Sequence, residues 1–77
     1  MDMLLQKEGV MMTLATNETK LKIARKRIPG LTQLDVATKA NISLMSYQRY
    51  ESGLRRPNVD TAKSIAEALN STIEEIF

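Results

Sequence analysis

The sequence predicts an all-α fold, a compact bundle of about five short helices. Apolar residues recur at the i, i+3, i+4 spacing of helices that bury one face through most of residues 17–77. Ser, Thr or Asn stands before each of these segments, where its side chain can accept hydrogen bonds from free N–H groups of the first helical turn. With 77 residues, the chain has room for one domain.

The first helix is expected over residues 17–28, with Thr16 or Asn17 as its cap. Pro29 and Gly30 should end it, because the residue before a proline avoids the helical region. The spacing predicts a buried stripe on this helix made of Leu21, Ala24 and Ile28.

Residues 32–53 predict two short helices joined by a tight turn. The first follows a Thr32 cap and covers residues 33–40, and the second follows a Ser43 cap and runs from residue 44 to about residue 52. Asn41 stands in the turn, and asparagine tolerates positive φ better than most residues. Gly53 should end the second helix. The residues expected to face inward are Val36, Ala37, Ala40, Ile42, Tyr47 and Tyr50.

Two more helices are expected after residue 57. Asn58 can cap the first, whose apolar stripe is Val59, Ala62, Ile65, Ala66 and Leu69. The second begins at Thr72, and Glu75 three residues later gives the spacing of a capping box. Its apolar residues Ile73, Ile76 and Phe77 should pack back on the core.

The composition excludes several classes of function. The chain has no Cys and no His, which removes disulfides, thiol catalysis and the usual zinc sites. No Ser–base pair, phosphate-cradling Gly loop or carboxylate dyad is present either, so we expect no enzyme, no catalytic residue, no cofactor and no metal. No stretch has the length of a membrane span, and the N-terminus is a poor secretory signal, so a cytoplasmic protein is expected.

The positive charge is concentrated in the middle of the chain. Residues 20–56 hold nine Lys or Arg against two acidic residues, whereas residues 1–19 and 57–77 are both net negative. Such clustering is typical of a protein that binds a polyanion, although a solvated basic face without a partner has the same pattern. Residues 1–16 have no helical or strand period, and we interpret them as an N-terminal arm that is flexible or forms a dimer contact.

The arrangement resembles the helix-turn-helix of phage-repressor-like DNA-binding proteins, the Cro and C1 type that includes the lambda repressor. The resemblance covers about residues 20–77, with the helix-turn-helix at residues 32–53 in a domain of residues 17–77. The residues that match are Gln33, Ala37, Ile42, Ser43 and the run Glu51-Ser52-Gly53. Several positions depart from the family pattern. Asn41 replaces the usual turn glycine, Ser71 replaces a small aliphatic residue, and Leu44 and Met45 stand where the family more often has polar residues. The loop at Pro29 and Gly30 is also one residue longer than is common.

The resemblance implies a sequence-specific transcriptional regulator, a repressor of bacterial or phage type, that binds double-stranded DNA as a homodimer. It places the second helix of the motif in the major groove, where Leu44, Met45, Gln48 and Arg49 would reach bases. It also implies phosphate contacts by Gln33 and Ser43, and Arg55 and Arg56 follow on a loop that can reach the backbone.

The resemblance further implies an ion pair between Glu51 and a cation of the first helix. Arg25 and Lys26 are both candidates, and Arg25 is preferred because its planar fork suits a bidentate carboxylate.

Two other functions fit the same residues. One is an antitoxin that represses its own operon and binds a toxin protein. The other is a protein-interaction module without DNA, which the apolar pair Leu44 and Met45 favours and the arginines of residues 49–56 oppose.

Overall fold

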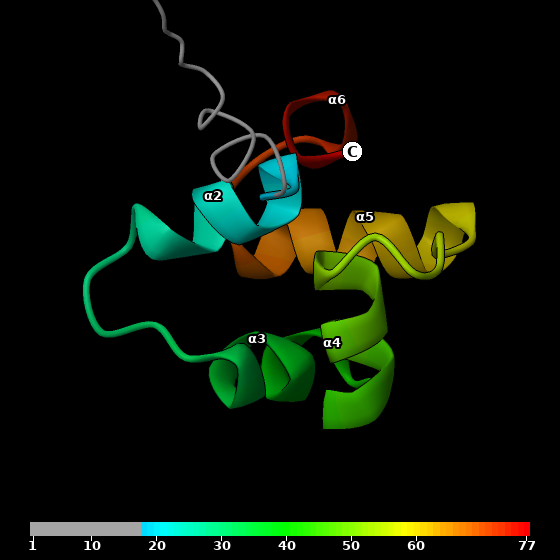
Figure 1. Cartoon of the computed structure of the whole chain (residues 1–77), viewed down its shortest axis with the longest axis horizontal. Coiled ribbons are helices and arrows are strands. Elements are labelled where there is room, and N and C mark those ends of the chain that lie inside the picture. Colours follow the sequence, from blue (N-terminus) through cyan, green and yellow to red (C-terminus); the bar gives the residue numbers. More distant parts are fainter. Residues whose placement is uncertain (1–17) are drawn as a thin grey trace, which may run out of the picture.

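The computed structural model describes residues 18–77, and this part of the chain folds into helices only (Figure 1). In order, they are α2 (Lys20–Lys26), α3 (Gln33–Ala40), α4 (Leu44–Glu51), α5 (Val59–Ala68) and α6 (Ile73–Ile76). The predicted all-α class is therefore confirmed. The predictions about an N-terminal arm concern residues 1–16, which lie outside the described residues. No helix within residues 18–77 has the length and apolar character that crossing a membrane requires.

Every described helix begins with a side-chain cap. The hydroxyl or amide oxygen of the cap residue accepts a hydrogen bond from the backbone N–H three residues later. Four caps are those predicted, and two of them form capping boxes, Thr32 with Asp35 and Thr72 with Glu75. At the four predicted caps, contacts within three residues are enough to set the start of α3, α4, α5 and α6. The caps are Thr19, Thr32, Ser43, Asn58 and Thr72.

The predicted bounds of the first helix, residues 17–28, were wrong. The helix begins at Lys20, because Thr19 has extended backbone (ψ 159°) and caps it. The Thr19 hydroxyl also donates to the main-chain oxygen of Glu51 at 2.6 Å, so a contact with α4 selects this cap. The helix ends at Lys26, two residues before Ile28. Ile28 is therefore outside the helical spacing and is 37% exposed instead of buried.

All five described helices contribute buried residues to the core. α3 packs against α4 and α5, whereas α2 packs against α6 and α4. Val59 was predicted to be buried but is 74% exposed, because it is the first residue of α5 and projects beyond the core. Ile73 and Phe77 pack against the core as predicted. Its buried members are Leu21, Val36, Ala37, Ala40, Tyr47, Ile65, Ala66, Leu69 and Ile76.

The arrangement separates two sides of the molecule. α5 contacts both α3 and α6, and it lies between α6 and the α3–α4 pair (Figure 1). In this view α3 and α4 lie together at the bottom, whereas α6 and the C-terminus lie at the top. α4 packs mainly against α3 and α2.

The turn between α3 and α4 depends on Asn41. Its backbone is left-handed, with φ 60° and ψ 43°, and its N–H caps the end of α3. The next N–H, that of Ile42, donates to the Ala37 oxygen at 3.0 Å and completes the reversal of the chain. The crossing of α4 over α3 therefore requires a residue that accepts positive φ at position 41.

We predict that Asn41→Ala destabilises the domain by about 1–2 kcal/mol, because an alanine side chain is strained in the left-handed region. Urea unfolding followed by circular dichroism measures the change. Asn41→Gly is the control and should be close to neutral, because glycine adopts positive φ freely. Equal unfolding midpoints for the Ala and Gly variants would show that this backbone conformation is not required.

Candidate nucleic-acid interface

A buried carboxylate organises the region around α4. Glu51, the last residue of α4, is only 2% exposed. Its Oε2 accepts from Arg25 Nε at 2.8 Å and from the Tyr47 hydroxyl at 2.6 Å. Its Oε1 accepts from Gln33 Nε2 at 2.8 Å and from Arg25 Nη2 at 3.1 Å. One carboxylate therefore joins α2, α3 and α4.

The structure brings Arg25, and not Lys26, to this carboxylate. The Arg25 guanidinium donates to both carboxylate oxygens of Glu51, and its Nη1 donates to the main-chain oxygen of Leu31 at 3.0 Å. The same side chain therefore fixes the loop that leads into α3. Lys26 instead reaches Glu18 at 2.8 Å on the surface.

The hydrogen bonds keep this buried group ionised. Burial raises the pKa of the Glu51 carboxyl, but the hydrogen bonds from Arg25, Tyr47 and Gln33 outweigh burial and hold the pKa below its ordinary value. Burial, followed by the hydrogen bond to Glu51, raises the pKa of Tyr47, so its hydroxyl stays a neutral donor. The bond to Glu51 raises the pKa of Arg25, which stays charged.

The opposite face of α4 is open to solvent. Tyr47 and Glu51 are buried and Tyr50 packs partly against the core, so the helical period turns the remaining side chains outward. Met45 is 61% exposed and Leu44 is 37% exposed at the edge of this face. Gln48, Arg49 and Ser52 are also exposed. We call the exposed side chains of Leu44, Met45, Gln48, Arg49 and Ser52 the outer face of α4.

Gln33 connects the buried carboxylate to this outer face. Its Nε2 donates to Glu51, and its Oε1 accepts from Gln48 Nε2 at 3.1 Å. Sequence reasoning had assigned Gln33 to a phosphate contact and did not include these two bonds. The bond between Tyr47 and Glu51 was also missed, although their i, i+4 spacing on one helix is a usable signal. No comparable signal in the sequence links Gln33 to residues of α4.

The Ser43 side chain caps the start of α4. Its oxygen accepts from the Ser46 N–H at 3.0 Å, and its hydroxyl lies 3.0 Å from the Ser46 hydroxyl. Ser43 is exposed at the start of an eight-residue helix, where the first N–H groups have no partner within the helix.

Arg49 on the outer face of α4 is followed along the chain by two more exposed arginines, Arg55 and Arg56. The Arg49 oxygen accepts from Leu54 N at 3.0 Å and from Arg55 N at 3.3 Å, which folds the loop back on the end of the helix. Gly53 makes this possible with φ 81°. The side chains of Arg49, Arg55 and Arg56 are exposed, and none makes an ion pair with another residue in the range 18–77.

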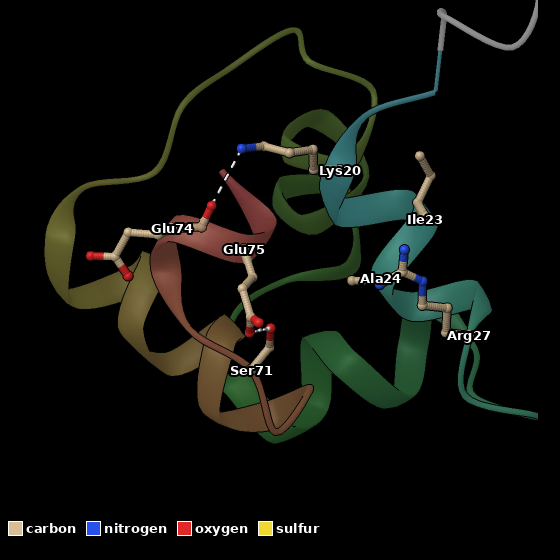
Figure 2. A pocket seen from close by; sticks show the side chains of 7 residues that line it. All are labelled: Lys20, Ile23, Ala24, Arg27, Ser71, Glu74 and Glu75. Atoms are coloured by element: carbon tan, nitrogen blue, oxygen red, sulfur yellow. Dashed lines mark hydrogen bonds between the residues drawn. The ribbon is translucent and has the colours of Figure 1, made fainter.

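A separate groove of about 370 Å³ lies between α2 and α6 (Figure 2). Lys20 Nζ donates across the groove to the main-chain oxygen of Glu74 at 3.3 Å. The Ser71 hydroxyl donates to the Glu75 carboxylate at 2.8 Å. The groove carries charges of both signs, so it does not suit a polyanion. Among the described residues, no cluster of His, Cys, Asp or Glu could hold a metal ion.

The fold and the site define a helix-turn-helix: two short helices joined by a sharp turn, the second with one face open to solvent. The model of the helix-turn-helix family matches residues 21–76, and the chain belongs to that family. The predicted resemblance is thereby confirmed.

A curated relative agrees with this assignment. The chain is 42% identical over 57 residues to the cryptic phage CTXphi transcriptional repressor RstR of Vibrio cholerae serotype O1. The matched region covers 74% of this chain and 50% of the relative, so this chain spans about half the length of that protein. No solved structure matches the chain. Family and relative both point to DNA-binding transcriptional regulators rather than to an enzyme class.

We predict that Arg25→Met destabilises the domain by about 3–5 kcal/mol, because it leaves a buried carboxylate without its cation. Arg25→Lys should have an intermediate effect, because it keeps the charge and loses the fork. Urea unfolding of both variants measures the loss, and an unfolded Arg25→Met protein would agree with it.

Lys26→Met is the matched control, since Lys26 belongs to the same helix and pairs with Glu18 on the surface. It should cost no more than about 1 kcal/mol. Equal losses for the methionine variants at positions 25 and 26 would contradict the assigned role of Arg25.

We also predict how the stability of the domain depends on pH in the acid range. The pKa of Glu51 is lower in the folded protein than its unfolded value of about 4.3, so its stabilisation is complete above that pH and is lost as the pH falls further. Glu18, Asp35 and Glu75 also have lowered pKa values and act in the same direction. The chemical shift of the Glu51 carboxyl carbon, followed by NMR across a pH titration, reports the pKa of this residue separately from the other carboxyls. A midpoint at or above about 4.3 would contradict the prediction.

Proposed function

We propose that this chain is a sequence-specific double-stranded DNA-binding transcriptional regulator, a repressor of bacterial or phage type. The observation that carries the proposal is the outer face of α4, which is exposed while the opposite face is held by Glu51. A helix fits the major groove of B-DNA, and a rigidly seated helix can keep its side chains in register with base edges. The basic segment of residues 20–56 supplies the attraction to phosphates.

The outer face of α4 offers groups of the chemistry that bases recognise. Arg49 could bond guanine O6 and N7 or a phosphate, and Gln48 could pair with adenine. Leu44 and Met45 are the exposed apolar side chains at the start of α4, and they suit thymine methyl groups. We propose these four residues as the base-reading set.

Phosphate contacts would orient the helix in the groove. We assign them to Arg55 and Arg56 on the loop after α4, and to the N-terminal ends of α3 and α4 at Gln33 and Ser43. The side chain of Gln33 is engaged with Glu51 and Gln48, so its phosphate contact would come from its backbone N–H at the first position of α3.

We propose that the protein binds DNA as a homodimer, because one such motif reads only a few base pairs and related proteins use palindromic sites. We also propose that it acts in the cytoplasm. Leu54 and Val59, which are 81% and 74% exposed, are apolar side chains near the end of the motif that a second copy could cover. The repression reported for the phage relative is a property of that protein, and occupancy of an operator would produce the same effect here.

A second candidate function is a protein-interaction module, such as an antitoxin that also binds a toxin. The observation that favours it is Met45, which is 61% exposed beside Leu44. Exposed apolar side chains that lie together often mark protein interfaces.

We predict that the protein selects one palindromic family of sites from a pool of random duplexes, and that binding falls steeply with salt. Replacing Arg55 and Arg56 with alanine should reduce the slope of log K against log salt by about 0.9 for each lost phosphate contact.

Arg49→Ala should weaken binding to the selected site by about fivefold or more, because a good bidentate pair discriminates by about 1–3 kcal/mol. Fluorescence anisotropy across a salt series measures both effects.

Lys63→Ala is the control, because it removes an exposed positive charge from α5 outside the motif. It should leave the salt slope and the selected sequence unchanged. Absence of DNA binding at low salt, or equal effects of the Arg49 and Lys63 variants, would reject the proposal and favour a protein partner at Leu44 and Met45.

A further inference from the structure

The side-chain amide of Gln48 belongs to a chain of hydrogen bonds that starts in the core. Glu51 accepts from Gln33 Nε2 at 2.8 Å, and Gln33 Oε1 accepts from Gln48 Nε2 at 3.1 Å. A carboxylate that stays ionised can only accept, so the nitrogen of Gln33 must face Glu51. The oxygen of Gln33 must then face Gln48, and Gln48 must turn its own nitrogen toward Gln33.

Each link of this chain has little freedom. Glu51 cannot rotate away, because Arg25 and Tyr47 occupy the rest of its acceptor sites. Gln33 is partly buried at the start of α3, and both ends of its amide are engaged. The orientation of an exposed amide on α4 is thus set by a charge in the protein interior.

We propose that Gln33 is a positioning residue that fixes the amide of Gln48 in the orientation that reads adenine. With one N–H donated to Gln33, Gln48 has its oxygen and its second N–H left for a ligand. Adenine presents the complement of this pair in the major groove, a donor at N6 and an acceptor at N7. Guanine presents acceptors at both O6 and N7, which the outward oxygen of Gln48 opposes. This inference rests on the proposed DNA-binding function.

The buried ion pair thereby has a second role. Arg25, Tyr47 and Glu51 hold the helices together, and through Gln33 they also select which polar atom Gln48 turns outward. An amide without this chain could rotate by half a turn and exchange its oxygen and nitrogen. Base preference at one position would then weaken although the helix kept its place.

The test uses the full-length protein and the site selected from random duplexes. The base pair read by Gln48 is identified as the one whose preference disappears in Gln48→Met, and we expect adenine there. Gln33→Met keeps the length of the side chain and removes both hydrogen bonds. It should lower the preference for adenine over guanine at that pair by about fivefold or more, with unchanged preferences elsewhere.

A double-mutant cycle separates positioning from stability. In the Gln48→Met background, Gln33→Met should have no further effect on base preference at this pair, because no amide is left to orient. Leu34→Met is the matched control on α3, since Leu34 is 57% exposed and makes none of these bonds. An unchanged adenine preference in Gln33→Met, or equal weakening on all sequences, would overturn the proposal. A preference of Gln48 for any other base would do the same.

A measurement without DNA keeps the inference distinct from the proposed function. The side-chain amide hydrogens of Gln48, observed by NMR in the free protein, should shift and exchange faster in Gln33→Met and be unaffected in Leu34→Met. Unchanged Gln48 signals in the Gln33 variant would overturn the chain of bonds itself. Wild-type protein that shows the expected amide signals but selects no DNA sequence would instead reject the proposed function, and with it the assignment to adenine.

Discussion

The described structure depends on keeping one ionised carboxylate in the interior. Glu51 is 2% exposed, and a charge removed from water is tolerated only when it is paired and hydrogen-bonded. Arg25, Gln33 and Tyr47 meet that demand from three helices. Replacing a buried ion pair by apolar residues is often neutral or stabilising, so its presence does not by itself explain stability. What it does provide here is a fixed geometry: the donors can satisfy Glu51 only when α2, α3 and α4 have one relative placement.

That placement matters for the proposed function because base recognition needs accuracy in the position of a few side chains. The inner face of α4 is held by Tyr47 in the core and by Glu51 at the end of the helix. The turn at Asn41 sets the other end, where its positive φ directs the chain into the Ser43 cap. With both ends fixed, the orientation of the outer face of α4 is set by contacts of the helix itself. The acidic segment that follows residue 57 lies on α5 and α6, apart from this face.

Much of the fold is readable from local sequence signals, because caps, left-handed turns and helical spacing act over three or four residues. Thr32, Ser43, Asn58 and Thr72 start helices as predicted. Local signals failed where a distant contact decided the outcome: Thr19 caps α2 while also bonding Glu51, 32 positions away. Val59 fits the apolar period but lies at a helix end, outside the core. For the candidate site, charge and motif indicate which residues to examine, whereas the bonds of Gln33 depend on how two helices cross.

The central claim is that the face of α4 opposite Glu51 is the surface that meets DNA. Titration of isotope-labelled protein with the duplex that it selects, followed residue by residue by NMR, tests this most directly. We expect the largest shifts on residues 43–49, on Arg55 and Arg56, and on the side-chain amides of Gln33 and Gln48. The signals of α6 and of the groove between α2 and α6 should stay unchanged. Shifts centred on that groove, or no shifts with any duplex, would show that this face of α4 does not bind DNA.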